Sequence, residues 1–217
     1  MNLLIIGAPG AGKGTMSEMI LDKYHLIHVS TGDMLRAAVK NGTPVGLKAQ
    51  EYMNRGELVP DEVIHDIIVE RLSQDDIEAG FLFDGYPRTL NQAIDLDAIL
   101  TELGKKIDGV INLNIEDAEL IKRITGRRLC PSCGEIYNIY FMPPKEEGKC
   151  DKCGAELIQR KDDNLESLEV RLSEYHKNTQ PVIEYYEKTG VVRHIDAKQA
   201  IEKVFADIDA VLEGLCK

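Results

Sequence analysis

The sequence predicts an α/β fold in which a doubly wound, mostly parallel sheet is covered by helices and interrupted by two insertions. Short apolar runs alternate along the chain with segments of helical periodicity, the pattern of a parallel sheet buried on both faces. The 217 residues are enough for one such domain with a sizeable core. Two stretches, 30–60 and 127–163, break the alternation, so we expect the core to consist of residues 1–29, 61–126 and 164–217.

The strands and helices of the core follow from this alternation. Strands are expected at the apolar runs 3–6, 26–29, 81–83, 110–113 and 191–195. Helical patterns lie between them at 13–24, 61–73, 90–103, 116–124 and 167–188, and a further helix ends the chain. Helix starts and ends are marked by capping residues, namely Thr43 followed by Pro44, Gly56 and Gly104.

The two insertions differ in character. Residues 30–60 contain two successive helical patterns with no strand between them, which indicates a helical insertion. Residues 127–163 are rich in Cys, Gly, Pro and charge, and only the short pieces 136–137 and 139–141 are β-like. A compact excursion of that length needs its own staple, because it lacks the apolar residues for a core.

Charge and composition restrict the classes of function. The net charge of −11 argues against a general nucleic-acid binder, because phosphate backbones reward excess Lys and Arg. The chain has no run of about 18 apolar residues that could span a membrane. Its first residues lack the basic segment of a signal peptide. We therefore expect a cytoplasmic protein that binds neither nucleic acid nor membrane, with cations concentrated locally if its ligand is a polyanion.

A phosphate-binding loop is predicted at residues 7–15. This glycine-rich segment follows a strand and opens a helix, so that backbone N–H groups and the helix N-terminus face an anion while Lys13 reaches its oxygens. The next residue departs from the general motif, because Gly14 replaces the usual Ser or Thr and the hydroxyl comes one place later, at Thr15. The alternative is a strand-to-helix turn without a ligand. The lysine and the flanking strand favour the phosphate-binding interpretation.

A second motif follows the strand at 81–83. The strand leads directly into Asp84. In phosphate-transfer sites a carboxylate at this position holds Mg²⁺ through water. A buried strand can also end in Asp as a helix cap, so this position alone does not decide between the two. The segment 30–36 likewise reads as the capped start of a helix.

The four cysteines of the second insertion form two knuckles. Cys130 and Cys133 make the first C-x-x-C-G, and Cys150 and Cys153 make the second after sixteen intervening residues. This spacing indicates a closed, tetrahedral and therefore structural Zn²⁺ site. Two disulfides or a redox dithiol are the alternatives. Cys216 is left over and is expected to be an inert thiol near the end of the chain.

These motifs together resemble the adenylate kinases among the nucleoside monophosphate kinases. The resemblance rests on the Gly-Lys-Gly-Thr ending of the loop with Pro9, on Asp-Gly-Tyr-Pro-Arg at 84–88 and on 30–36, and it covers essentially the whole chain. It implies reversible transfer of a phosphoryl group from Mg²⁺·ATP to AMP, giving two ADP and maintaining adenine nucleotide balance, by a monomeric enzyme. It also implies that 30–60 is an AMP-binding insertion and 127–163 a zinc-stapled lid, a version found in many Gram-positive bacteria.

The resemblance assigns roles to individual residues. The catalytic set it implies is Lys13, Asp84, Arg88, Arg123, Arg160 and Arg171. The ATP-binding set is Gly10, Ala11, Gly12, Lys13, Gly14, Thr15, Arg123, Arg127, Ile136, Tyr137 and Gln199. The AMP-binding set is Thr31, Gly32, Arg36, Glu57, Leu58, Val59, Gly85, Tyr86, Pro87, Arg88, Gln92, Arg160 and Arg171. Asp162 and Asp163 are implied as partners that hold lid arginines. Because the AMP phosphate attacks as an anion, no general base is needed and no histidine is assigned to catalysis.

Three other functions are weighed against this one. Another nucleoside monophosphate kinase would use UMP, CMP or GMP, but Thr31, Gln92 and the segment 57–59 favour AMP. A zinc-ribbon nucleic-acid module would need a basic, aromatic face that the chain lacks. A P-loop switch would hydrolyse ATP without an acceptor.

Overall fold

The fold is built on a parallel sheet, as the sequence predicts. The computed structural model describes residues 1–215 of the chain, and Cys216 lies outside them. Five parallel strands are ordered β2-β3-β1-β4-β7. Their bounds are Asn2–Gly7 for β1, Ile27–Ser30 for β2, Phe81–Asp84 for β3, Gly109–Asn114 for β4 and Val192–Asp196 for β7. The central strand β1 is buried along almost its whole length, which explains its continuous apolar run.

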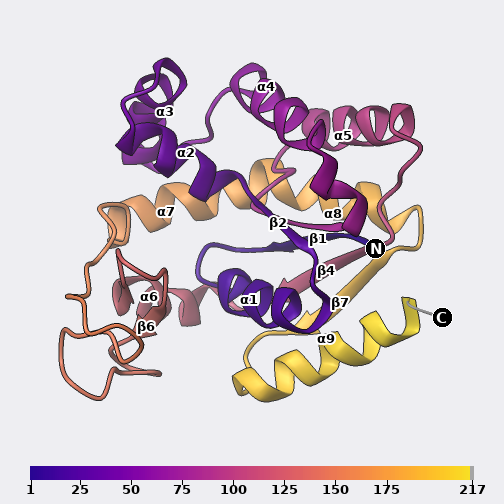
Figure 1. The fold of residues 1–217 in the computed structure, drawn as a ribbon. Coiled ribbons are helices and arrows are strands. Elements are labelled where there is room, and N and C mark those ends of the chain that lie inside the picture. Colours follow the sequence, from indigo (N-terminus) through magenta and orange to yellow (C-terminus); the bar gives the residue numbers. More distant parts are fainter. Residues whose placement is uncertain (216–217) are drawn as a thin grey trace.

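Helices cover both faces of the sheet (Figure 1). On one face, α1 (Lys13–Tyr24) and α9 (Ile201–Leu215) pack against alternate strand residues such as Leu3, Leu82 and Ile111. On the other, α4 (Asp61–Leu72), α5 (Leu90–Glu102) and α8 (Gln180–Glu187) pack against the intervening ones, such as Leu4 and Phe83. The short helices α6 (Asp117–Thr125) and η1 (Asp75–Ala79) complete the core. This arrangement is the doubly wound sheet that the sequence predicts.

The first insertion forms the helix pair α2 (Thr31–Lys40) and α3 (Pro44–Arg55). Its capping residues behave as predicted. The Thr43 hydroxyl accepts from the Gly46 N–H with Pro44 in the first turn, and Gly56 ends α3 in the left-handed region, with φ 74°. These caps confirm the helix start and end that the sequence indicates.

The expectation of one helix over 167–188 is wrong in detail. The helical segment begins earlier, as α7 (Leu165–Glu174), continues through a π-helical turn η2 (Tyr175–Thr179) and ends as α8. Pro181 lies in the first turn of α8 and has no N–H to donate to the preceding turn. The Thr179 hydroxyl also donates to the Arg88 carbonyl, 2.9 Å away. Both features favour a wider turn at this point.

The second insertion contains a two-stranded antiparallel sheet, β5 (Arg127–Leu129) with β6 (Ile136–Asn138). Residues 139–141, also read as β-like, form no strand. The Asn138 side-chain oxygen accepts from the N–H groups of Tyr140 and Phe141 and turns the chain, so that both rings are exposed. The only buried cluster of this segment among the described residues consists of Cys130, Tyr137 and Cys150. A core this small needs a staple.

Gly46 provides a test of the packing between α2 and α3. A Cβ at this position would lie 2.2 Å from the carbonyl carbon and oxygen of Ala38. We therefore expect Gly46→Ala to lower the free energy of unfolding by about 1–3 kcal/mol, although alanine is the better helix former. Thermal denaturation should show a drop of about 2–4 °C per kcal/mol. The matched control is Gly214→Ala in α9, where an added Cβ meets nothing within 4 Å. An unchanged or raised melting temperature for Gly46→Ala would contradict this packing.

Candidate functional site

The glycine-rich loop between β1 and α1 is shaped for an anion. Gly10 and Gly12 have φ of 88° and 101°, which only glycine adopts easily. No side chain caps the N-terminus of α1 and no acidic residue lies in its first turn. The N–H groups of this turn therefore face outward without a competing carboxylate, as a phosphate site requires. Ala11, Gly14 and Thr15 complete the predicted loop.

Lys13 lies across this loop. Its Nζ donates to the carbonyl oxygens of Gly7 and Ala8 at 2.7 and 3.1 Å. Burial lowers the pKa of Lys13 to about 8, with Asp84 opposing the shift and three nearby arginines adding to it. Lys13 therefore stays protonated at neutral pH. A bound anion would stabilise its charged form more than it would that of a fully solvated lysine.

Gly14, the departure from the general motif, has a structural reason. A Cβ at Gly14 would lie 3.3 Å from Cδ1 of Ile136 in β6. The second insertion thus lies directly on the loop, and glycine leaves room for it. The other β6 residue of the predicted set, Tyr137, is buried, and its hydroxyl accepts from the Asp151 N–H at 2.8 Å. Its ring belongs to the cysteine cluster.

Five arginines meet opposite Lys13, although they come from distant parts of the chain. They are Arg36 of α2, Arg88 after β3, Arg127 of β5, Arg160 after the two-stranded sheet and Arg171 of α7. Burial lowers the pKa of Arg171 to about 10, and repulsion by Arg127 and Arg88 adds to the shift, while Asp162 opposes it. These groups are close enough to repel one another, so a bound anion would stabilise their arrangement.

Arg160 shows this frustration most clearly. Burial lowers its pKa to about 10, and the neighbouring charges of Arg36 and Arg127 lower it further, while Asp163 and Asp33 oppose the shift. Its Nε is buried and has no hydrogen-bond partner. A buried guanidinium donor without an acceptor is costly unless a ligand supplies one.

Two aspartates hold the arginines in place. Asp163, whose side chain is fully buried, accepts two hydrogen bonds from Arg127, one of them from Nε at 2.8 Å. Asp162 pairs with Arg171 at 3.1 Å. These are the two carboxylates that the resemblance implies as arginine partners. On the other side of the cluster, Asp84 raises the pKa of Arg88 against the larger effect of burial.

Arg123 and Gln199 lie apart from this cluster. Arg123 donates to the carbonyl oxygens of Ala11 and Ala197, at 3.3 and 2.8 Å, and so ties α6 to the glycine-rich loop and to the turn after β7. Gln199, in the same turn, donates to Asp207 at 2.9 Å. Arg123 thus borders the loop directly, whereas Gln199 is held within the turn after β7.

A small cavity of about 80 Å³ opens beside Arg88 and Arg171, under the helix pair. Most residues predicted for AMP line it, namely Thr31, Gly32, Arg36, Glu57, Leu58, Val59, Gly85, Tyr86, Arg88, Gln92 and Arg171. Pro87 and Arg160 are not in its wall. The structure adds Leu35, Met53, Gly56, Ile64 and Asp162. Helical spacing could have indicated the apolar residues among them, since each amphipathic helix turns one apolar face toward the interior of the protein.

A larger cavity, of about 840 Å³, lies between the ends of β4 and β7 and the helix α8. Its described wall has several carboxylates, among them Glu116, Asp117 and Glu187, against one lysine, Lys198. A cavity with this charge does not suit a phosphate, so its size does not make it the candidate site.

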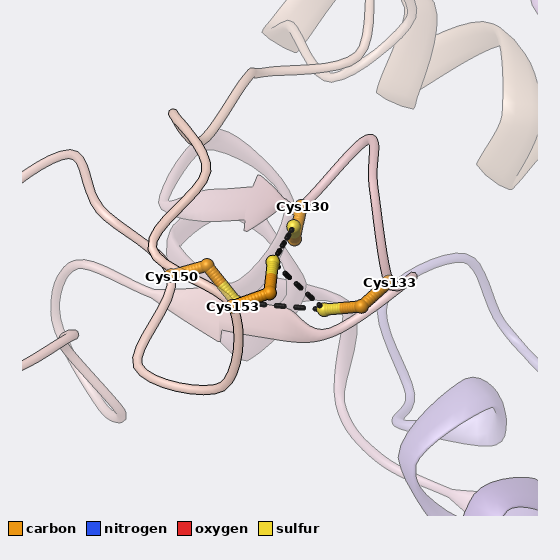
Figure 2. A group of neighbouring side chains, drawn as sticks. All are labelled: Cys130, Cys133, Cys150 and Cys153. Atoms are coloured by element: carbon orange, nitrogen blue, oxygen red, sulfur yellow. Dashed lines mark hydrogen bonds between the residues drawn. The ribbon is translucent and has the colours of Figure 1, made fainter.

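The four cysteines of the second insertion converge. Figure 2 shows their side chains pointing toward a common centre, and all four Sγ atoms lie within 4.8 Å of one another. The closest pairs are 3.4–3.6 Å apart, near the ~3.8 Å edge of a tetrahedron with Zn–S bonds of ~2.3 Å. Burial opposes ionisation of Cys150, but the Tyr137 hydroxyl and two N–H groups outweigh it and lower its pKa to about 6. This donor set fits a thiophilic metal better than a disulfide, whose sulfurs are ~2.05 Å apart.

Comparison with known proteins agrees with this geometry. Residues 5–191 match the family model described as adenylate kinase. Similar curated proteins, each named adenylate kinase, come from Geobacillus sp. (strain WCH70), at 56% identity over 99% of this chain and 100% of the relative, and from Carboxydothermus hydrogenoformans, at 54% over 98% and 100%. A third, from Archaeoglobus fulgidus, is 53% identical over 99% of both chains.

The pKa of Lys13 leads to a prediction of pH dependence. Below pH 8 the ammonium is already charged, so anion affinity should be constant. Above pH 8 binding must first protonate Lys13, so the affinity should fall by up to ~10-fold per pH unit. Calorimetric titration with tripolyphosphate from pH 7 to 9.5 measures this, along with uptake of close to one proton at pH 9. Lys13→Arg, which stays charged, is the matched control and also corrects for titration of the probe. Parallel profiles for both proteins would contradict the assignment.

Proposed function

The chain belongs to the adenylate kinase family, and from this premise we propose that its cation cluster transfers a phosphoryl group between ATP and AMP, giving two ADP. The observation that carries the proposal is the meeting of Lys13 and five arginines between two anion sites. One site is the glycine-rich loop, and the other is the cavity beside Arg88. A phosphoryl group that passes between them would remain within reach of the same cations.

This arrangement suits the chemistry of phosphoryl transfer. The transition state spreads negative charge over the transferred group and needs in-line positioning more than a covalent nucleophile. Planar guanidinium groups suit phosphate oxygens, and Lys13 supplies a point charge at the loop. The AMP phosphate attacks as an anion, so no side chain has to remove a proton. On this proposal Lys13, Arg88, Arg123, Arg160 and Arg171 are the catalytic cations.

Asp84 fits a role beside a bound metal ion. It ends β3 next to Lys13 and Arg88, and its carboxylate makes no side-chain hydrogen bond to any described residue. Hard oxygen ligands of this kind suit Mg²⁺. We propose that Asp84 holds the ion through water and that the Thr15 hydroxyl lies toward it. When bound, Mg²⁺ neutralises charge on the β- and γ-phosphoryl oxygens.

The division into three parts follows from where the cations come from. Residues 1–29, 61–126 and 164–217 would form the core, 30–60 the AMP-binding insertion and 127–163 the lid. Arg36 belongs to the first insertion, and Arg127 and Arg160 belong to the second. Closure of both insertions would assemble the cluster and exclude water. The contact between Ile136 and the loop at Gly14 supports this role of the lid.

For the cysteine cluster we propose a structural Zn²⁺. Four thiolates fill a tetrahedral shell and leave no position for substrate. The metal would therefore organise the lid without contacting phosphate, and its binding would be coupled to lid folding. The enzyme is expected to be a cytoplasmic monomer, and sedimentation would test the oligomeric state. In the described part of the chain no helix is long and apolar enough to cross a membrane.

The activity can be tested with a coupled assay of ADP formation. Wild-type protein should form ADP from ATP and AMP far faster than from ATP with UMP, CMP or GMP, and should hydrolyse ATP alone only slowly. Lys13→Met should lower kcat by about 10³- to 10⁵-fold, because a transition-state cation is lost. Lys23→Met is the matched control on the same helix, where Lys23 pairs with the carboxylates of Asp209 and Glu213. Activity of a folded Lys13→Met variant within tenfold of wild type would refute the loop assignment.

The metal site gives a separate prediction about stability. Replacing Cys130 and Cys133 with serine should abolish stoichiometric zinc and lower the melting temperature by several degrees, since ~1 kcal/mol corresponds to ~2–4 °C in a chain of this size. Activity well below the new midpoint should largely persist. Ser132→Ala, in the same knuckle, should keep its zinc. Purified wild-type protein with four free thiols and no metal would overturn the proposal, as would a folded serine variant that is inactive at low temperature.

A further inference from the structure

Gln92, which the family resemblance assigns to AMP binding, forms a pair with Asp61, a residue to which the proposed reaction gives no role. Asp61 is the first residue of α4, and Gln92 lies in the first turn of α5, which packs beside α4 (Figure 1). Gln92 Nε2 donates to Asp61 Oδ1 at 2.6 Å. Gln92 Oε1 accepts from the backbone N–H of Arg88 at 2.7 Å. Both ends of the carboxamide are therefore held, and Gln92 also lines the small cavity.

The two partners permit only one orientation of the carboxamide. An ionised carboxylate only accepts hydrogen bonds and a backbone N–H only donates them. If the Gln92 side chain turned over, its oxygen would face the Asp61 carboxylate and its NH₂ group would face the Arg88 N–H. Both contacts would become repulsive. With 5% of Gln92 exposed, water has little access to replace the lost bonds.

Asp61 is itself fixed by a second bond. Its Oδ2 accepts from the Thr89 hydroxyl at 3.0 Å. The same Thr89 oxygen accepts from the Gln92 N–H and caps α5. The Tyr86 hydroxyl donates to the backbone carbonyl oxygen of Gln92 at 3.3 Å. The carboxylate that orients Gln92 is thus held by the same turn that carries Gln92, which leaves it little freedom to follow a turned side chain.

Each hydrogen-bonding end of the Gln92 amide keeps one free position. One lone pair of Oε1 and one N–H of Nε2 remain to be satisfied by a ligand in the cavity. Adenine offers a matching edge, with a donor at its 6-amino group and an acceptor at N1. Guanine in the same pose offers the opposite pattern, with an acceptor at O6 and a donor at N1. A carboxamide that could turn over would match either base, and one that is locked matches only one.

We propose that Asp61 is a specificity-determining residue, which locks the Gln92 carboxamide in the orientation that accepts a 6-amino purine monophosphate and rejects a 6-oxo purine monophosphate. The inference rests on the proposed function, with Gln92 in the AMP-binding role that the family resemblance assigns to it. Asp61 acts through Gln92 and is therefore a positioning residue. Its effect is exclusion, because the lock makes the wrong pairing costly without adding a contact to the correct base.

The test compares AMP and GMP as acceptors. Asp61→Asn keeps the size of the side chain but can donate as well as accept, so the lock is lost. We expect the ratio of kcat/KM for AMP to that for GMP to fall about 10- to 100-fold, the value of one hydrogen bond to a charged group. The absolute rate with GMP should rise while kcat with AMP stays near wild type. Damage to the fold cannot raise a rate, so this gain distinguishes positioning from stability.

Two further variants separate the possible outcomes. Asp95→Asn is the matched control. It also removes one carboxylate charge, but Asp95 lies in α5 and contacts His65 instead of Gln92, so the ratio should stay unchanged. Gln92→Ala tests the premise. If it leaves the ratio unchanged, Gln92 does not read the base, and its proposed role and the inference fail together. If Gln92→Ala lowers the ratio but Asp61→Asn does not, the proposed function stands and the inference about Asp61 is overturned.

A measurement on wild-type enzyme covers the case in which Asp61→Asn fails to fold. Nuclear magnetic resonance of the Gln92 side-chain amide, with AMP bound, should show a rigid group with at least one proton protected from exchange. Free rotation of this amide on the nanosecond timescale would overturn the proposal. Asp61→Ala, which removes the acceptor altogether, should lower the ratio as well, and an unchanged ratio in that folded variant would also overturn it.

Discussion

Repulsion between like charges is the constraint on which the rest of the structure depends. Lys13 and five arginines come together inside a chain whose net charge is −11, so the excess of acid elsewhere does not relieve the local excess of cations. Water is partly excluded there, which makes each repulsion stronger than on the surface. Individual carboxylates next to the arginines offset part of this repulsion. The clearest example is buried Asp163, which pairs with Arg127. The charges are balanced only partly, and a polyphosphate would complete the balance.

The same constraint explains why the cations lie on separate parts. A single rigid element could not carry six positive groups toward one point without great cost. They are distributed instead over the core, the helix pair and the second insertion, so that no single element carries them all. Besides the Arg171–Asp162 pair, the second insertion meets the core through modest contacts, among them bonds from the Asn138 amide to the carbonyl oxygens of Lys122 and Arg123. Ile136 packs at Gly14, and Lys152 faces Glu18 at 3.7 Å with both side chains half exposed. Exposed ion pairs of this kind contribute little free energy. The arginines and their ligand would therefore supply most of the free energy that holds the second insertion against the core.

The sequence predicts those features that depend on neighbours in the chain. The strands, the glycine-rich loop, the Thr43 and Gly56 caps and the cysteine knuckles all follow from local pattern, and the parallel sheet follows from their alternation. The π-helical turn and the turn after Asn138 were missed because they arise from contacts that periodicity does not report. Asp61 was missed for another reason. An aspartate at the start of a helix needs no further explanation than the helix dipole, and its bond to Gln92 joins residues 31 positions apart. The roles of the site residues remain predictions.

The π-helical turn at 175–179 has a consequence for how this chain tolerates insertions and deletions. Such a turn accommodates one residue more than an α-helical turn does, while the flanking segments keep their packing. Loss of one residue within this turn would turn it into a regular α-helical turn and leave α7 and α8 in nearly the same relative orientation. Arg171 would keep facing Lys13, and the change would fall on contacts made inside the turn, such as the bond from the Thr179 hydroxyl to the Arg88 carbonyl. In the regular turns of α7 or α8, by contrast, loss of one residue would rotate the two flanking segments against each other by about 100° and shift them by about 1.5 Å along the axis. The π-helical turn is therefore the place where this helical segment can change its length by one residue at the smallest cost to the site.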